Sequence, residues 1–215
     1  MSQLVKEKII NLRLVGKERK RQLLINCTID SIAKNGLRET TLDKVTKLAG
    51  LSLGLVNFHF KSKELLLLET LQYLAKEYSS TWHKALNEAG NDPTKQLIAI
   101  INSSFNKKVV SRNKVAVWYA FYSELKFIDS YKEVCQKYDN QFVQTTRTLI
   151  KEIIAKEKRE NINADILANV LSNLIDGLWL DLLMTPEKFD HKRAKNVCII
   201  FLSNIFPKQF SKYLK

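Results

Sequence analysis

The chain has 215 residues, of which 45% are hydrophobic, so it can bury a core and is not expected to be disordered. That length fits one small module followed by a medium-sized bundle. The formal net charge is +13, and residues 1–63 carry +8 of it through 13 Lys/Arg against 5 Asp/Glu. This basic first third indicates a polyanionic partner, with nucleic acid favoured over an anionic membrane surface. General solubility charge is the alternative.

Three cysteines, Cys27, Cys135 and Cys198, are widely spaced and form no CxxC pair, so neither a disulfide framework nor a zinc site is expected. Reduced thiols in a cytoplasmic protein are the plain interpretation. Charged residues from Lys6 to Arg13 interrupt the apolar stretches at the N-terminus, which argues against a signal peptide. We expect no bilayer-spanning run, no membrane partner, no metal and no cofactor.

Glycine and proline are scarce, and apolar residues recur at the helical period, so the sequence predicts an all-α protein. Candidate caps set the helix ends: Thr40 and Asp43 have capping-box spacing, and Gly36 ends the first helix. Nine helices are expected, three in a head and six in a body, over residues 17–35, 40–49, 53–60, 63–86, 93–110, 111–127, 129–159, 163–184 and 190–206.

The same pattern divides the chain into three parts. Residues 1–16 form a basic N-terminal arm, either mobile or a frayed helical extension. Residues 17–63 form a candidate helix-turn-helix DNA-binding domain, and residues 64–215 form a helical body, which the family resemblance described below implies to be a ligand-binding and dimerisation domain. In the head, two short helices flank the tight turn at residues 50–52, and the second helix should enter the major groove. An ordinary helical corner is the alternative.

The string from Thr40 to Leu66, with AGLSLG and FHFKSKELL, resembles the signature of the TetR family of repressors. The resemblance implies a three-helix head, a third helix that reads DNA, and a fourth that joins head to body. It also implies that six residues lie near DNA: Thr41, Ser52, Leu53, Asn57, His59 and Lys63.

The expected roles of these six residues differ. Thr41 and Ser52 stand at helix N-termini, where hydroxyl and backbone N–H groups bind phosphate. Leu53 and Asn57 would face bases, and Lys63 would pair with a phosphate. For His59, a phosphate contact and an ordinary surface position remain equal alternatives. Phe58 and Phe60 are assigned to the core of the head.

Two strings in the body combine aromatic rings with carboxylates: WYAFYSE at residues 118–124 and LIDGLWLD at residues 174–181. Aromatic faces attract a quaternary ammonium, and a carboxylate adds charge complementarity. The alternative is that the rings are core. With AVWYAFYSE and LIDGLWLD, the chain is similar to the choline-responsive, BetI-type branch of the TetR family, which represses genes for making glycine betaine. We therefore expect a ligand site made by Trp118, Phe121, Tyr122, Glu124, Asp176 and Trp179.

The resemblance also implies choline or a related quaternary ammonium as effector, with another apolar or cationic ligand as the alternative. The last two helices resemble the family's dimerisation pair, through Leu167, Val170, Leu171, Leu174, Val197, Ile200, Phe201 and Ile205. A homodimer on a palindromic double-stranded DNA operator follows. No nucleophile elbow, HExxH, P-loop or GxGxxG occurs, so the protein is not expected to be an enzyme.

Overall fold

The computed structural model describes the backbone of residues 3–214 and the side chains of residues 14–214, and this part of the chain contains helices and no strand. The predicted all-α class is therefore confirmed. The elements are α1 (Gln3–Asn35), α2 (Leu42–Ala49), α3 (Leu53–Phe60), α4 (Lys63–Glu88), α5 (Pro93–Ser103), α6 (Arg112–Tyr122), α7 (Asp129–Glu157), α8 (Ala164–Met184), α9 (His191–Ile205), α10 (Pro207–Phe210) and the 3₁₀ turn η1 (Ser211–Tyr213).

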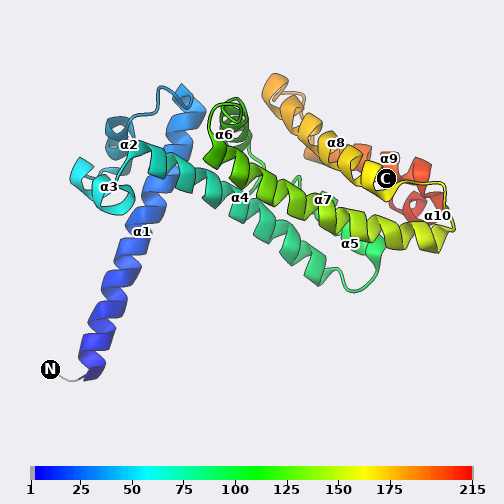
Figure 1. Ribbon diagram of the computed structural model, residues 1–215, viewed down its shortest axis with the longest axis horizontal. Helices are drawn as coiled ribbons and strands as arrows, with labels where there is room; N and C mark the ends of the chain where they lie inside the picture. The colour runs from blue at the N-terminus through cyan, green and yellow to red at the C-terminus, as the bar shows by residue number, and fades with distance from the viewer. Residues whose placement is uncertain (1–2, 215) are drawn as a thin grey trace.

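The helices form a head and a body joined by one long helix (Figure 1). Helices α1–α3 make the head, and α4 runs from the head into the body, where it packs on α5 and α7. Helix α7 in turn packs along α8, and α9 and α10 close the far end. Helix α6 sits at the junction, because it contacts α1 of the head and α8 of the body. It is therefore the element placed between the two predicted sites.

Most helix starts follow the predicted capping chemistry. The Ser62 hydroxyl accepts the backbone N–H of Leu65 at 3.2 Å and begins α4. Asp92 caps α5 ahead of a proline in the first turn, and its carboxylate accepts the Lys95 N–H at 2.9 Å. Each cap satisfies a backbone donor that the first helical turn leaves free.

The cap of α2 differs from the prediction. Thr41 holds the N-cap position, and its hydroxyl accepts the Lys44 N–H at 3.3 Å. Thr40 is instead buried, with its hydroxyl donating to the Gly36 carbonyl at 2.9 Å and lying 3.1 Å from the Ser31 hydroxyl. Capping-box spacing was misleading here because Thr40 fixes the preceding loop rather than the helix.

Three helix ends also differ from the prediction. Helix α1 begins at Gln3, so the expected arm at residues 1–16 runs into the first helix; residues 1–2 and the arm's side chains before residue 14 lie outside the described part. Helices α5 and α6 end early, at Ser103 and Tyr122. At both ends serine hydroxyls donate to carbonyls three or four residues back, an alternative to continued helix.

Beyond α9, the chain does not stop being helical. Pro207 starts the short helix α10 instead of merely ending α9. A proline is well tolerated at the first helical position because the N–H it lacks would have no helical partner there. The buried Glu157 carboxylate accepts the Gln209 N–H at 3.0 Å and ties α10 to the end of α7.

Gly36 offers a direct test of the head's loop geometry, because its φ of +83° is unfavourable for a side chain. We expect Gly36→Ala to lower stability by about 1 kcal/mol and the melting temperature by about 2–4 °C. Gly16→Ala, inside α1, is the matched control and should not destabilise. Equal melting temperatures for the two variants in circular dichroism would contradict this loop conformation.

Candidate functional site

Helix α3 presents a continuous exposed face on the head. Leu53, Gly54, Asn57 and Phe58 are all exposed, and they recur at the helical spacing that places residues on one side. The opposite side packs into the head through Val56 and Phe60, each 1% exposed. The sequence assignment of Phe60 to the core is confirmed, whereas that of Phe58 is wrong: Phe58 is 64% exposed.

His59 does not belong to the exposed face of α3. Its ring lies beside Phe58 and Phe60, with centroids at 5.3 and 6.1 Å. Burial lowers the pKa of His59, and the nearby cations Lys17 and Arg21 on α1 lower it further. His59 is therefore partly buried beside its neighbouring rings and close to cations of α1, and its two possible roles stay predictions.

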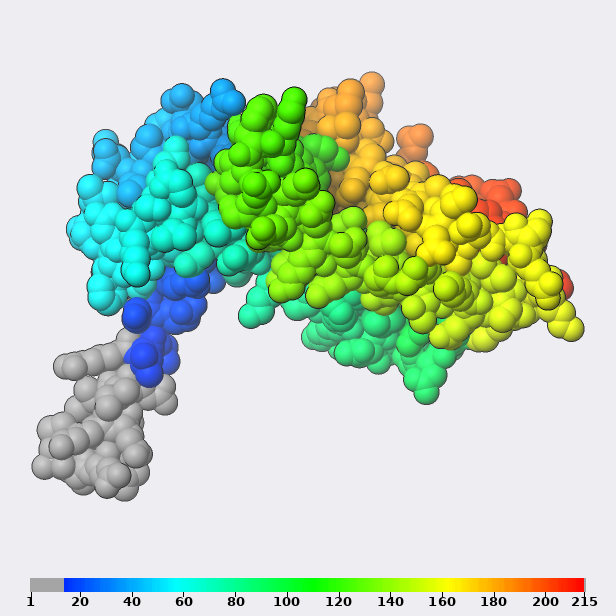
Figure 2. Space-filling view, in the orientation of Figure 1, coloured from blue at the N-terminus to red at the C-terminus, as the bar shows by residue number. Residues whose placement is uncertain are grey.

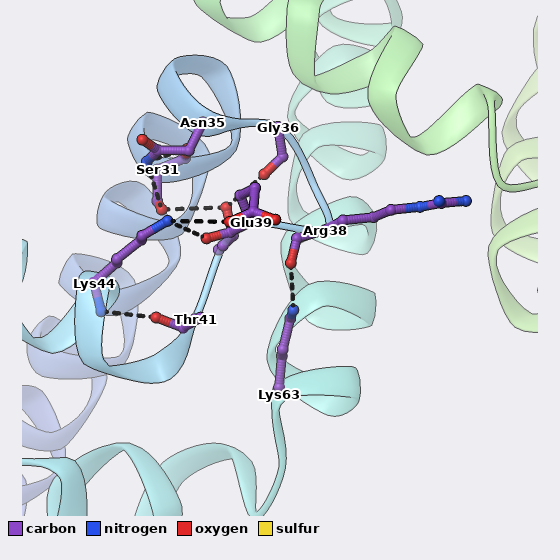
Figure 3. Close-up of polar contacts among 9 residues, drawn as sticks. Ser31, Asn35, Gly36, Arg38, Glu39, Thr41, Lys44 and Lys63 are labelled. Carbon is purple, nitrogen blue, oxygen red and sulfur yellow. Dashed lines mark hydrogen bonds and ion pairs between the residues drawn. The ribbon is translucent and has the colours of Figure 1, made fainter.

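The loop between α1 and α2 is held by two lysines (Figure 3). Lys44 of α2 donates to the Glu39 carbonyl at 2.6 Å and lies 3.8 Å from the Glu39 carboxylate. Lys63 of α4 donates to the Arg38 carbonyl at 3.1 Å. An ammonium has three donors, so Lys63 can hold the loop and still offer a donor to a phosphate.

The same loop connects the head to the body. The Arg38 side chain points away from the loop (Figure 3), and its Nε lies 3.4 Å from the Glu124 carboxylate, just beyond the end of α6. Glu124 was predicted to line a ligand site. The structure places it at this junction instead, and it places Phe121 against Tyr131 at a centroid distance of 5.0 Å. Neither joins the other predicted ligand residues.

The remaining body residues do converge, on Asp176 of α8. Tyr119 of α6 donates to the Asp176 backbone carbonyl at 2.8 Å. Its ring packs edge-on against Tyr122 at 5.7 Å, and Tyr122 lies 5.8 Å from Trp118. Helix α6 therefore presents aromatic rings to α8. Tyr119 was not among the predicted ligand residues.

Further rings come from helices that the sequence analysis left aside. Trp179, one turn after Asp176, donates its indole N–H to the Ser104 carbonyl at 2.9 Å. Tyr78 of α4 packs edge-on against Trp179 at 5.2 Å and shares Ser104 through a 2.9 Å hydroxyl contact. Phe142 of α7 stacks with Tyr78 at 6.3 Å. Four helices thus contribute to one aromatic cluster.

Asp176 is the electrostatic centre of this cluster. Burial raises the pKa of its carboxyl group to about 7, and the Asp139 carboxylate on α7 adds to the rise. Burial, with Asp176 nearby, also raises the pKa of the Tyr78, Tyr119 and Tyr122 hydroxyls, although Ser104 partly offsets this at Tyr78. Among the described side chains, no hydrogen-bond donor or cation meets the Asp176 carboxylate. The site therefore has two carboxylates and no counter-charge.

Sequence reasoning missed Asp139, Tyr78 and Phe142. These residues lie singly in the long helices α4 and α7, with no local aromatic string to mark them. One weak signal existed: Tyr78, Trp82 and Ser79 form a polar-aromatic group within an otherwise amphipathic helix. It takes the packing of α4 and α7 on α8 to bring these side chains to Asp176.

A hollow lies elsewhere, between α1, α4 and α7. It measures about 850 Å³ and opens to solvent where α1 leaves the head (Figure 2). Some of its charged side chains are paired: Arg21 pairs with Glu69, and Glu77 lies 2.6 Å from Lys114. An open groove lined mostly by charged and polar side chains is a poorer small-molecule site than a carboxylate among aromatic rings.

Helix α8 also has an apolar face that no other described helix covers. Ile166 and Met184 are 64% and 69% exposed, and Ile200 of α9 is 50% exposed. Val170 belongs to this face, but Leu167 and Leu171 are buried within the protomer, contrary to their predicted interface role. Among the described helices, α8 alone is long and apolar enough to cross a membrane, whereas the sequence analysis expected no such segment. The core helix of a helical bundle has the same length and composition, so this is weak evidence for a membrane span.

Comparison with known sequences decides the family. Residues 24–70 match the profile described as bacterial regulatory proteins of the tetR family. Residues 93–207, more than half of the chain, match the BetI-type transcriptional repressor C-terminal domain. The chain belongs to the TetR family. Its predicted membership of that family, with a BetI-type body, is confirmed.

Relatives and solved structures of this TetR-family protein agree. The BetI regulator of Vibrio parahaemolyticus is 28% identical over 192 residues, covering 88% of this chain and 92% of that protein. A transcriptional regulator from Pseudomonas aeruginosa PAO1 superposes with a TM-score of 0.79 at 21% identity, over 92% and 95% of the two chains. A Saccharomonospora viridis regulator solved in complex with choline gives 0.74 at 21% identity, over 86% and 96%.

The protein is therefore a TetR-type transcriptional repressor and not an enzyme. Regulators of this family bind DNA and a ligand and act as dimers. The geometry is compatible with that division of labour: the head presents an exposed face of α3, the body holds the aromatic-carboxylate cluster, and α6 contacts α1 of the head and α8 of the body. No group of three or more His, Cys, Asp or Glu side chains in the described range is arranged to hold a metal ion.

The raised pKa of Asp176 predicts a pH-dependent cost to stability. The folded state holds the carboxyl proton more tightly than the unfolded chain, so stability is lost as the pH rises from about 4 through about 7. We expect Asp176→Asn to raise the melting temperature by on the order of 5 °C at pH 8 and by little at pH 4. Asp181→Asn, exposed on the same helix, is the control. A pH-independent difference would contradict a buried, unpaired carboxylate.

Proposed function

We propose that this protein is a repressor released from DNA by choline or a related quaternary ammonium, and that it controls genes of betaine synthesis. The observation that carries the proposal is the unpaired Asp176 carboxylate beside Asp139 and among aromatic rings. A quaternary ammonium supplies the missing charge without needing a hydrogen-bond acceptor, and aromatic faces stabilise it by about 0.5–2 kcal/mol each. The choline complex of the Saccharomonospora viridis regulator supports this choice.

The ligand site that we propose contains Asp176, Trp179, Tyr122 and Trp118 from the predicted set, extended by Asp139 and Tyr78. Phe121 and Glu124 are not part of it, because Phe121 packs against Tyr131 of α7 and Glu124 pairs with Arg38 of the head loop. Another cationic ligand is the alternative within the same family. An apolar effector is less favoured, since it would leave the Asp176 carboxylate without a compensating charge.

On the DNA side, we propose that Thr41, Ser52 and Lys63 hold phosphates, while Leu53 and Asn57 face bases. All five belong to the head, and Thr41, Ser52, Leu53 and Asn57 are exposed. The apolar face of α8 and α9 would join two copies on a palindromic operator, with two reading helices about one DNA turn apart. A cytoplasmic location follows from this role.

Coupling between the two sites runs through α6 in this proposal. Tyr119 and Tyr122 face Asp176, and Glu124, two residues beyond, pairs with Arg38 of the head loop. A cation drawn between Asp176 and the α6 rings would reposition α6, and with it the loop that Lys63 also holds. Release requires only that the ligand bind the displaced arrangement more tightly.

Calorimetric titration of choline into the full-length protein tests the ligand. We expect saturable binding to the wild type and at least tenfold weaker binding to Asp176→Asn, because the amide retains the shape but not the charge. The uncharged isostere of choline, with a tert-butyl group in place of trimethylammonium, is the ligand control and should not bind measurably.

Two results would contradict the proposed ligand site. One is equal binding of choline and its uncharged isostere. The other is a choline affinity of Asp176→Asn equal to that of the wild type. Glu152→Gln is the control, because it removes a negative charge from an exposed position on α7 and should also bind choline like the wild type. Absence of choline binding together with intact site-specific DNA binding would leave the repressor and remove choline as its effector.

The coupling path is tested by Glu124→Gln. An exposed ion pair is weak, so we expect the ligand-induced loss of DNA affinity to shrink by about two- to fivefold, with choline affinity itself unchanged. Arg38→Gln should give the same change, and the double variant no more than either single one. Additive effects in fluorescence anisotropy of labelled DNA would rule out a shared path.

A further inference from the structure

The exposed face of α3 is unusual in its chemistry. Of its four residues, Leu53 and Phe58 are large and apolar and are 44% and 64% exposed, Asn57 is a neutral amide, and Gly54 has no side chain. An added Cβ at Gly54 would meet no atom within 4 Å, so nothing in the protomer requires a glycine there for packing. This face has no basic residue.

We propose that this face reads an A·T-rich half-site, with Phe58 and Leu53 against thymine methyl groups and Asn57 on an adjacent adenine. The inference rests on the proposed placement of α3 in the major groove. There, thymine presents a methyl group that apolar side chains contact, and adenine presents the N6 and N7 pair that Asn binds with two hydrogen bonds. Gly54 allows the backbone to approach the bases closely.

The same face argues against guanine as the base read by α3. Guanine is usually recognised through O6 and N7 by Arg or Lys, and neither occurs between Leu53 and Phe60. The one titratable ring of this helix, His59, is only partly exposed, and burial together with Lys17 and Arg21 lowers its pKa. Helix α3 would therefore distinguish bases through apolar contacts to thymine methyl groups and through hydrogen bonds of the Asn57 amide.

Charge around the face identifies DNA, and not a protein surface, as what covers it. Lys17 of α1 lies with its Nζ 5.0 Å from the centre of the Phe58 ring. Lys47 at the end of α2 and Lys61 directly after α3 are exposed, and Lys63 follows. An apolar strip bordered by lysines matches a groove whose floor carries methyl groups and whose rims carry phosphates.

Lys17 has a specific place in this arrangement. Its ammonium is held above the ring by attraction to the aromatic face, at the edge of the reading surface. A phosphate beside the contacted thymine would meet this ammonium directly. Helix α1 thus supplies a backbone contact next to a base contact from α3, which fixes where along the groove Phe58 is inserted.

The test begins with selection of binding sites from a pool of random-sequence duplex DNA by the full-length protein. We expect an enriched palindrome with consecutive A·T pairs in each half. Single thymines of that site are then replaced by deoxyuridine, which removes only the methyl group. At one position per half-site the wild type should bind about fourfold more weakly, the equivalent of ~0.8 kcal/mol for one methyl-sized group.

Phe58→Ala identifies the partner of that methyl group. In this variant deoxyuridine at the same position should cost nothing further, whereas Phe58→Leu should keep part of the effect. Phe127→Ala is the matched control, since Phe127 is 70% exposed and also lies under a lysine, but in the body. Because Phe58 is exposed, its replacement should leave the melting temperature unchanged.

Two outcomes would overturn the inference while leaving site-specific DNA binding in place: G·C pairs at the positions contacted by α3, or unchanged affinity after every thymine-to-deoxyuridine replacement. Failure to enrich any sequence would overturn the proposed reading role of the head, and this inference with it. Site selection and the binding curves with deoxyuridine-substituted sites together distinguish these three outcomes.

Discussion

A half-buried carboxylate without a hydrogen-bond or ion-pair partner is the feature on which the body of this protein depends. Taking an ionised group out of water costs several kcal/mol unless another charge or several hydrogen bonds compensate. Asp176 has neither within the described chain, and Asp139 makes its ionisation harder still. Asp176 stands in the region where α4, α6, α7 and α8 bring aromatic rings together. In the proposed function, binding of a cation there would offset the cost of ionising this carboxyl group.

The two ends of the molecule use aromatic residues in different ways. Near Asp176 the rings lie inside the body: the Tyr78 hydroxyl contacts the Ser104 hydroxyl, and the Trp179 indole N–H donates to the Ser104 carbonyl. These contacts fix the orientation of both rings. On α3, Phe58 faces outward with Lys17 above it. Between them, α6 carries Tyr119 toward the ligand side, and Glu124 just beyond its end meets Arg38 of the head. A short helix in contact with both regions can transmit a small displacement without any change in fold.

Local chemistry explains which parts were predictable from the sequence. Caps such as Ser62 and Asp92 act within four residues, so the helix starts and the head were foreseen. The placements of Phe58, Phe121 and Glu124 were not, because the side of a short helix that faces the core depends on neighbours far away in the chain. Asp139 carries no local signal and Tyr78 only a weak one, and the packing of α4 and α7 in the body brings them to Asp176. Helices α5 and α6 end earlier than predicted because serine hydroxyls bond to backbone carbonyls there, although the helical pattern of apolar residues continues past these serines.

Proton release on ligand binding tests the central claim most directly. At pH 6.5 a carboxyl group with a pKa near 7 is about three-quarters protonated, and a bound cation must displace that proton. Calorimetry of choline binding in buffers of different ionisation enthalpy measures the number released. The account predicts about three-quarters of a proton for the wild type and none for Asp176→Asn if residual binding is measurable at high protein concentration. Choline binding to the wild type with no proton release would contradict Asp176 as the group that receives the cation.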